Sequence, residues 1–82
     1  MPWSDPAERL AALREWFQIL VADPPAGLAR RDKLLQVAGE LYDEGNLDGR
    51  QYAAIFDLVR SLRAPDDPEV RDLAQNCLDL IR

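Results

Sequence analysis

The sequence predicts an all-α protein, a compact bundle of four short amphipathic helices with short connections that forms a single domain over residues 1–82. Three observations lead to this fold class. Apolar side chains recur every three or four residues in four separate segments. Proline, glycine and aspartate clusters separate those segments. No segment alternates with the period of two that a half-buried strand would show.

The first helix is expected to begin at Asp5, with Pro6 in the first helical position. Aspartate caps free backbone N–H groups, and proline has no N–H to lose in a first turn. The helix should end near Ala22, because Asp23 and the two prolines that follow it cannot continue the pattern.

The second helix is predicted from Gly27 or Leu28 to Gly45, a glycine able to take the left-handed conformation of a helix C-cap. Its start is the least defined boundary in the chain. The third helix should begin at Asp48, with Gln51 completing a capping box, and end at residues 64–65.

The fourth helix is predicted to open at Asp67, Pro68 and Glu69, in the order cap, proline and acid, and to run to Arg82. Each of the four helices then has one apolar face that should meet the core of a bundle of antiparallel neighbours. The expected core faces are Leu10, Leu13, Phe17, Leu20 and Val21; Leu34, Leu35, Ala38, Leu41 and Tyr42; Tyr52, Ile55, Phe56, Val59 and Leu62; and Val70, Leu73, Ala74, Cys77 and Ile81.

The apolar arcs are wider than a surface helix needs, at roughly 160–200° against ~100°. The surplus comes from side chains that flank the main faces: Trp16, Ile19, Val37, Leu58 and Leu80. These residues either fill the seams of a tight bundle or form an exposed strip that meets a partner protein or a second copy. Under the second reading they are the candidate partner-binding residues, and Trp16 is the favoured anchor because tryptophan is enriched at interface centres.

The segment from Glu44 to Gly49 has some features of a calcium-binding loop, with a glycine in the sixth position. The match fails at the twelfth position, which is Ile55 where a bidentate glutamate is required. A glycine C-cap followed by the Asp48 N-cap explains the same residues. The segment from Leu41 to Asp48, followed by Gln51 and Tyr52, resembles the short helical hairpins of many small bacterial proteins, and the resemblance identifies no family.

The composition argues against catalysis and against nucleic acid. The chain has no histidine and a single cysteine, Cys77, which is interpreted as a small buried hydrophobic residue. Nucleophilic catalysis therefore lacks its usual base, and the common zinc, haem and copper sites lack their ligands. We expect no enzyme activity, no metal and no cofactor. The net charge of −5 disfavours direct binding to nucleic acid or to an anionic membrane.

The sequence predicts a cytoplasmic location, because no signal peptide is visible and a single cysteine cannot form an internal disulfide. The leading hypothesis is a small bacterial or phage-type regulator, adaptor or inhibitor that binds another protein through an apolar helical face. One alternative is a structural homodimer. Another is an acidic mimic of nucleic acid that blocks a DNA-binding protein, carried by Asp66, Asp67, Glu69, Asp72 and Asp79.

Overall fold

The computed structural model describes residues 5–64 and 66–81. Its elements, in chain order, are α1 (Pro6–Ala22), the 3₁₀ helix η1 (Pro24–Arg30), α2 (Arg31–Asp43), α3 (Gly49–Ser61) and α4 (Glu69–Leu80). Within the described ranges there is no strand. The prediction of an all-α four-helix bundle is confirmed.

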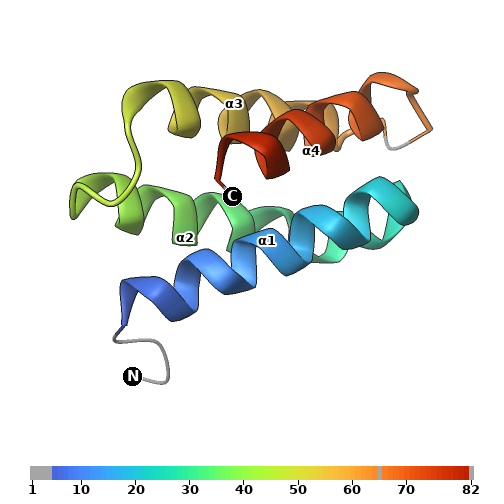
Figure 1. Ribbon diagram of the computed structural model, residues 1–82. Helices are drawn as coiled ribbons and strands as arrows, with labels where there is room; N and C mark the ends of the chain where they lie inside the picture. Colours follow the sequence, from blue (N-terminus) through green and yellow to red (C-terminus); the bar gives the residue numbers. More distant parts are fainter. Residues whose placement is uncertain (1–4, 65, 82) are drawn as a thin grey trace.

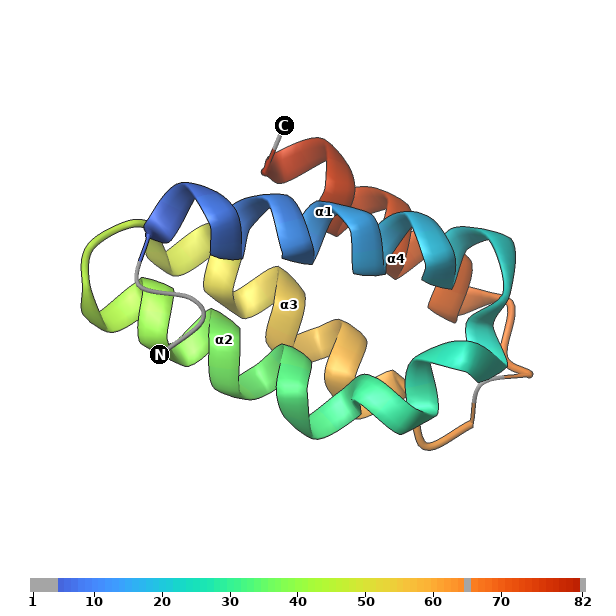
Figure 2. The same ribbon diagram turned by 90° about the horizontal axis from the view of Figure 1, so that it is seen from below.

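The four α-helices lie side by side in two layers, with α3 and α4 over α2 and α1 (Figure 1). Going around the bundle, α1 packs on α4, α4 on α3, α3 on α2 and α2 on α1, while η1 joins α1 to α2 at one end (Figure 2). Each helix thus has two helical neighbours and one side that faces outward. None of the described helices is long and apolar enough to cross a membrane.

The predicted starts of the first and third helices are confirmed by hydrogen bonds. The Asp5 carboxylate accepts from the N–H of Ala7 at 2.9 Å. Asp48 and Gln51 form the expected capping box, with each side chain accepting from the other residue's backbone N–H. The Asp67 carboxylate accepts from the N–H of Glu69 at 3.0 Å, although α4 itself begins at Glu69.

The predicted start of the second helix is wrong by a few residues. The segment Pro24–Arg30 forms a 3₁₀ helix, and α2 begins only at Arg31. The reason is a close approach: η1 packs back on α1, and a Cβ on Gly27 would lie 1.8 Å from Cδ2 of Leu20. Only a residue without a side chain fits there. Gly27, which the sequence pattern placed at a helix start, is therefore required for the packing of η1 on α1.

Two predicted helix ends are also shortened. The third helix ends at Ser61 rather than at residues 64–65. The fourth ends at Leu80, and its expected last residue, Arg82, lies outside the described residues. The predicted C-cap at Gly45 is confirmed by its φ of 80°. There the N–H of Asn46 donates to the carbonyl of Leu41, and that of Gly45 to Tyr42, which is the Schellman pattern.

The core draws on all four α-helices and on the turn after α2. Its largest fully buried side chains come from every helix: Leu13, Phe17, Leu20, Leu34, Val37, Leu41, Ile55, Leu58, Leu62, Val70 and Cys77. Leu47, in the turn between α2 and α3, is buried as well. This apolar side chain ties the turn to the core and limits how far the two helices can separate.

One charged side chain is buried among these apolar residues. Arg9, on the first turns of α1, is only 5% exposed. Its guanidinium forms a two-pronged ion pair with Glu44 at the end of α2, with Nη1 2.8 Å from Oε2, and a longer contact to Glu40 at 3.5 Å. This ion pair links the beginning of the chain to the turn that leads into α3.

Side chains from neighbouring helices also satisfy carbonyl groups near the ends of α3 and α4. Arg31 donates to the carbonyl of Val59, near the end of α3, at 3.1 Å. Gln51 donates to the carbonyl of Leu80 at 2.8 Å, and Arg14 to that of Ile81 at 3.1 Å. The last carbonyls of a helix have no partner within the helix, so these bonds also hold the helices in register.

We predict that Glu44→Gln destabilises the protein near neutral pH and has less effect in acid. The hydrogen bond from Arg9 holds the pKa of the Glu44 carboxyl below its usual value. The stabilisation is therefore complete above the usual pKa of the carboxyl, and it is lost as the pH falls through the lowered value. Thermal melts of both proteins between about pH 7 and about pH 3 should show the difference in Tm shrinking.

The control for this experiment is Asp43→Asn, which removes a neighbouring exposed carboxylate outside the Arg9 ion pair. A Tm difference between wild type and Glu44→Gln that stays constant with pH would contradict the role assigned to this ion pair.

Candidate functional site

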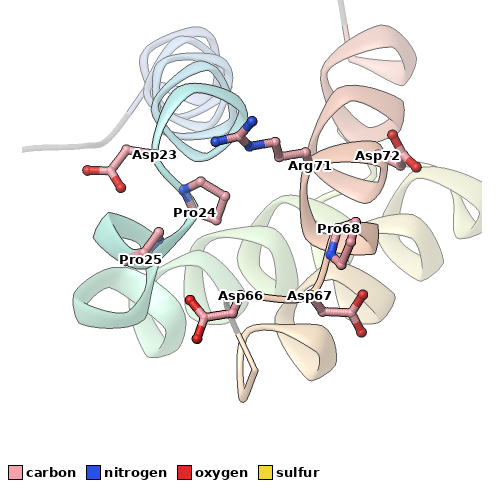
Figure 3. A pocket seen from close by; sticks show the side chains of 8 residues that line it. All are labelled: Asp23, Pro24, Pro25, Asp66, Asp67, Pro68, Arg71 and Asp72. Carbon is pink, nitrogen blue, oxygen red and sulfur yellow. The ribbon is translucent and has the colours of Figure 1, made fainter.

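The clearest cavity lies between the end of α1 and the loop before α4, with a volume of about 640 Å³. Its lining is acidic and rich in proline: Asp23, Pro24, Pro25, Asp66, Asp67, Pro68, Arg71 and Asp72. Figure 3 shows the guanidinium of Arg71 extending from α4 toward the end of α1, while the carboxylates of Asp66 and Asp67 point away from one another. These carboxylates are exposed, and that of Asp67 accepts from the N–H of Glu69, the first residue of α4.

The acidic lining does not converge on one point. Among the residues that the structure describes, no group of three or more histidine, cysteine, aspartate or glutamate side chains is arranged to hold a metal ion. The acidic residues that would imitate the phosphates of a nucleic acid are also dispersed over the surface. Asp66, Asp67 and Asp72 line this cavity, Glu69 lines a different depression, and Asp79 lies near the far end of α4.

Cys77 is buried in the core, as its sequence context predicts. Burial raises the pKa of its thiol to about 12, and the negative charge of Asp57 adds to the shift. A thiol in this state stays protonated at neutral pH, so it is a poor nucleophile. The interpretation of Cys77 as a small hydrophobic residue is confirmed.

For two of the five candidate partner-binding residues the structure favours the alternative that they fill the seams of the bundle. Val37 and Leu58 are 2% and 0% exposed and belong to the core. The reason is that α2 and α3 are flanked on both sides and bury arcs wider than a single stripe. Neither residue can contact a partner in the folded protein.

The other three candidates, Trp16, Ile19 and Leu80, are partly buried, and Trp16 and Leu80 do not lie on one flank. Trp16 lies two helical turns after Arg9, so it shares the flank of α1 that turns toward α2. Arg14, which lies about 200° around the helix from Trp16, reaches the end of α4. Leu80 is in that last turn of α4, and its carbonyl accepts from Gln51 of α3. Trp16 and Leu80 therefore lie on different sides of α1.

The structure instead exposes two aromatic residues that the sequence pattern assigned to the core. Tyr42 on α2 is 44% exposed, and Phe56 on α3 is 42% exposed. The ring of Tyr42 stacks on that of Tyr52, with centroids 4.7 Å apart and planes 14° from parallel. Since Phe56 follows Tyr52 by four residues, it lies one turn further along the same side of α3. The three rings form an aromatic row across two helices.

Leu35 and Gly39 extend this row along α2, because they lie seven and three residues before Tyr42. A Cβ added to Gly39 would meet none of the described residues within 4 Å, so this side of the helix opens outward. We call Leu35, Gly39, Tyr42, Tyr52 and Phe56 the α2–α3 face. In Figure 1, α2 and α3 lie behind α1 and α4, and the exposure of Tyr42 and Phe56 assigns the α2–α3 face to the outer side of these two helices.

Charged residues border the α2–α3 face differently on its two sides. Asp32 and Asp43 are exposed on the outer side of α2. Arg60, in the last turn of α3, and Arg63, in the turn that follows it, are exposed and line a shallow depression of about 710 Å³ that extends from Phe56 to Leu73 on α4. One edge of the face thus carries carboxylates, and the other carries two arginines beside the carboxylates of Asp57 and Glu69.

Two signals in the sequence could have identified this face. Gly39 stands inside a helix, where glycine costs about 0.5–1 kcal/mol relative to alanine, and no turn or close contact within the chain requires it. Tyr42 and Phe56 also lie at the edges of their apolar arcs, where an aromatic side chain can be either core or surface. Only the packing of α2 against α3 decides between these two placements.

Comparison with known protein families, with characterised proteins and with solved structures finds no match for this chain. The candidate site therefore rests on the geometry of the chain itself.

We predict effects of very different size on stability for two neighbouring apolar residues of α3. Leu58→Ala should lower the free energy of unfolding by about 2–5 kcal/mol, because it opens a cavity in the core. Phe56→Ala should lower it by less than about 1 kcal/mol, because much of its ring is already in solvent. Urea unfolding followed by circular dichroism measures both, and similar losses for the two variants would contradict the assigned burial.

We also predict that Cys77 is unreactive in the folded protein. At about pH 8, iodoacetamide should leave the native thiol largely unmodified, because the thiolate is scarce and the residue is buried. The same reagent should modify the chain completely in guanidinium, which serves as the control. Stoichiometric labelling of the folded protein, seen by mass spectrometry, would show that Cys77 is accessible and ionised.

Proposed function

We propose that this chain is a small non-enzymatic regulator, adaptor or inhibitor that acts in a bacterial or phage-infected cytoplasm by binding another protein through the α2–α3 face. The observation that carries the proposal is the row of three aromatic residues, Tyr42, Tyr52 and Phe56, two of them more than two-fifths exposed. Single exposed apolar residues are normal on a protein surface, whereas a contiguous group marks an interaction site.

The chemistry of the face supports a protein as the ligand. Aromatic side chains are enriched at the centres of protein interfaces, where they bury a large area at a small entropic cost. The tyrosine pair is already held by stacking, so little side-chain freedom is lost on binding. Charges of both signs at the edges can select an orientation. The absence of histidine from the sequence and the protonated, buried state of Cys77 support a role without catalysis.

We predict that Phe56→Lys abolishes binding to the protein partner and leaves the fold intact. The partner is sought by capture from the source cell on the tagged protein, followed by mass spectrometry. The matched control is Gln18→Lys, which adds the same charge at an exposed position of α1 outside the face. Binding of the identified partner should weaken at least about tenfold in Phe56→Lys and remain unchanged in Gln18→Lys.

Two other outcomes would contradict the proposal. Equal binding by wild type and Phe56→Lys would exclude the α2–α3 face. Loss of binding in Trp16→Ala with retention in Phe56→Lys would place the docking surface on the flank of α1 that carries Trp16.

The acidic mimic is a second candidate, and the carboxylates of Asp23, Asp66, Asp67 and Asp72 around one cavity favour it. A mimic would bind a DNA-binding protein with an affinity that falls steeply as salt is added, because its contacts are mainly between charges. The paired change Asp66→Asn and Asp72→Asn should then abolish binding, whereas Phe56→Lys should leave it unchanged.

A further inference from the structure

The α2–α3 face has a regular arrangement along its length. The two helices run antiparallel, and the stacked pair Tyr42 and Tyr52 marks one level along them. The hydrogen bond from Arg31 to the carbonyl of Val59 marks a second level near the opposite end. Every other residue of the face can be placed relative to these two contacts.

At one level along the two helices, α3 carries a large side chain and α2 carries a glycine. Gly39 lies one turn before Tyr42, and Phe56 lies one turn after Tyr52. Because the helices are antiparallel, Gly39 and Phe56 are at about the same height. On α3 that height carries a ring that projects into solvent, and on α2 it carries a helix surface with open space above it.

The charges follow the same pattern at the second level. Asp32 is next to Arg31 on α2, and Arg60 is next to Val59 on α3. Asp32 and Arg60 each have a loose partner on their own helix, at 3.9 Å, from Arg31 and Asp57 respectively. An acidic group on one side of the face therefore stands at the height of a basic group on the other.

We infer that the α2–α3 face pairs with the same face of a second copy of this chain, about a two-fold axis that runs parallel to the two helices. Rotation about this axis leaves the position of each residue along the helix direction unchanged and exchanges the two sides of the face. Therefore α2 of one copy lies over α3 of the other. Phe56 then meets the second copy's Gly39, and Asp32 meets the second copy's Arg60. Both contacts occur twice.

The charges distinguish this arrangement from the other two-fold pairing of the same face. An axis perpendicular to the helices would set α2 against α2, with Asp32 of one copy opposite Asp43 of the other. That pairing brings like charges together, which costs free energy at an interface. Helix glycines allow two backbones to approach closely, so Gly39 has a role between two chains that it lacks within one.

This inference rests on the proposed function, since it assigns an occupant to the same face, and self-pairing would compete with any other partner. Light scattering and sedimentation from about 1 µM to about 1 mM should show a monomer converting to a dimer. Gly39→Gln should remain monomeric over that range while its Tm does not fall, because glutamine favours helix and meets nothing within 4 Å in the single chain. Ala11→Gln, on the exposed side of α1, is the matched control and should dimerise like wild type.

A charge exchange tests the direction of the axis. Asp32→Arg alone, and Arg60→Asp with Arg63→Asp, should each raise the dimer Kd by about tenfold, because both place like charges opposite one another. An equimolar mixture of the two variants should dimerise like wild type, since only the mixed dimer pairs opposite charges in both symmetry-related contacts. If the dimer Kd of the mixture is no lower than that of either variant alone, this two-fold arrangement is overturned.

The remaining outcomes separate the pairing from the proposed function. A wild type that stays monomeric throughout overturns the pairing, and it leaves the proposed function in place if Phe56→Lys still abolishes binding of another protein. A dimer lost in Gly39→Gln supports the pairing, and with no other partner dependent on Phe56 it would replace the proposed function by self-association. A Gly39→Gln variant that dimerises like wild type overturns the pairing.

Discussion

The ion pair between Arg9 and Glu44 is the contact on which the arrangement of this bundle depends. Arg9 is nearly buried, and a buried guanidinium is costly unless a carboxylate meets it. Glu44 supplies that carboxylate from the end of α2, next to the glycine that turns the chain toward α3. The start of α1 is thereby held against the α2–α3 turn. Because the Nε of Arg9 has no partner within the described residues, the ion pair serves more to set orientation than to add stability.

Once the α2–α3 turn is held in this way, the remaining helices can cover only one side of it. α1 and α4 pack on the side that carries Leu41, Ile55 and Leu58, and these side chains are fully buried. Within the described residues no helix covers the opposite side, where Tyr42 and Phe56 lie. A domain of this size has too few elements to cover every apolar flank. The exposed aromatic row is the consequence of that limit, and its charged edges give it the properties of an interface.

The two candidate surfaces of the molecule have different physical characters. The cavity beside Pro24 and Pro68 is lined by exposed carboxylates that point in different directions, so their charges do not converge on one ligand position. The α2–α3 face has an ordered tyrosine pair, a projecting ring and an open glycine at matched heights. Order and complementarity are what a binding surface needs in order to outweigh the entropy lost on association. The face is therefore the stronger site, although the cavity is the more evident hollow.

The sequence by itself determined the fold class, the number of helices and the helix caps at Asp5, Asp48 and Gly45, because these depend on local spacing and backbone chemistry. Tertiary structure alone decided which apolar flanks are covered. Val37 and Leu58 are core, whereas Tyr42 and Phe56 are surface, and their positions at the edges of the arcs are compatible with either outcome. The roles of Arg9 and Gly27 were equally hidden, since each depends on a residue of another element, Glu44 or Leu20. Helical periodicity places a side chain on its own helix, and only packing determines what lies opposite it.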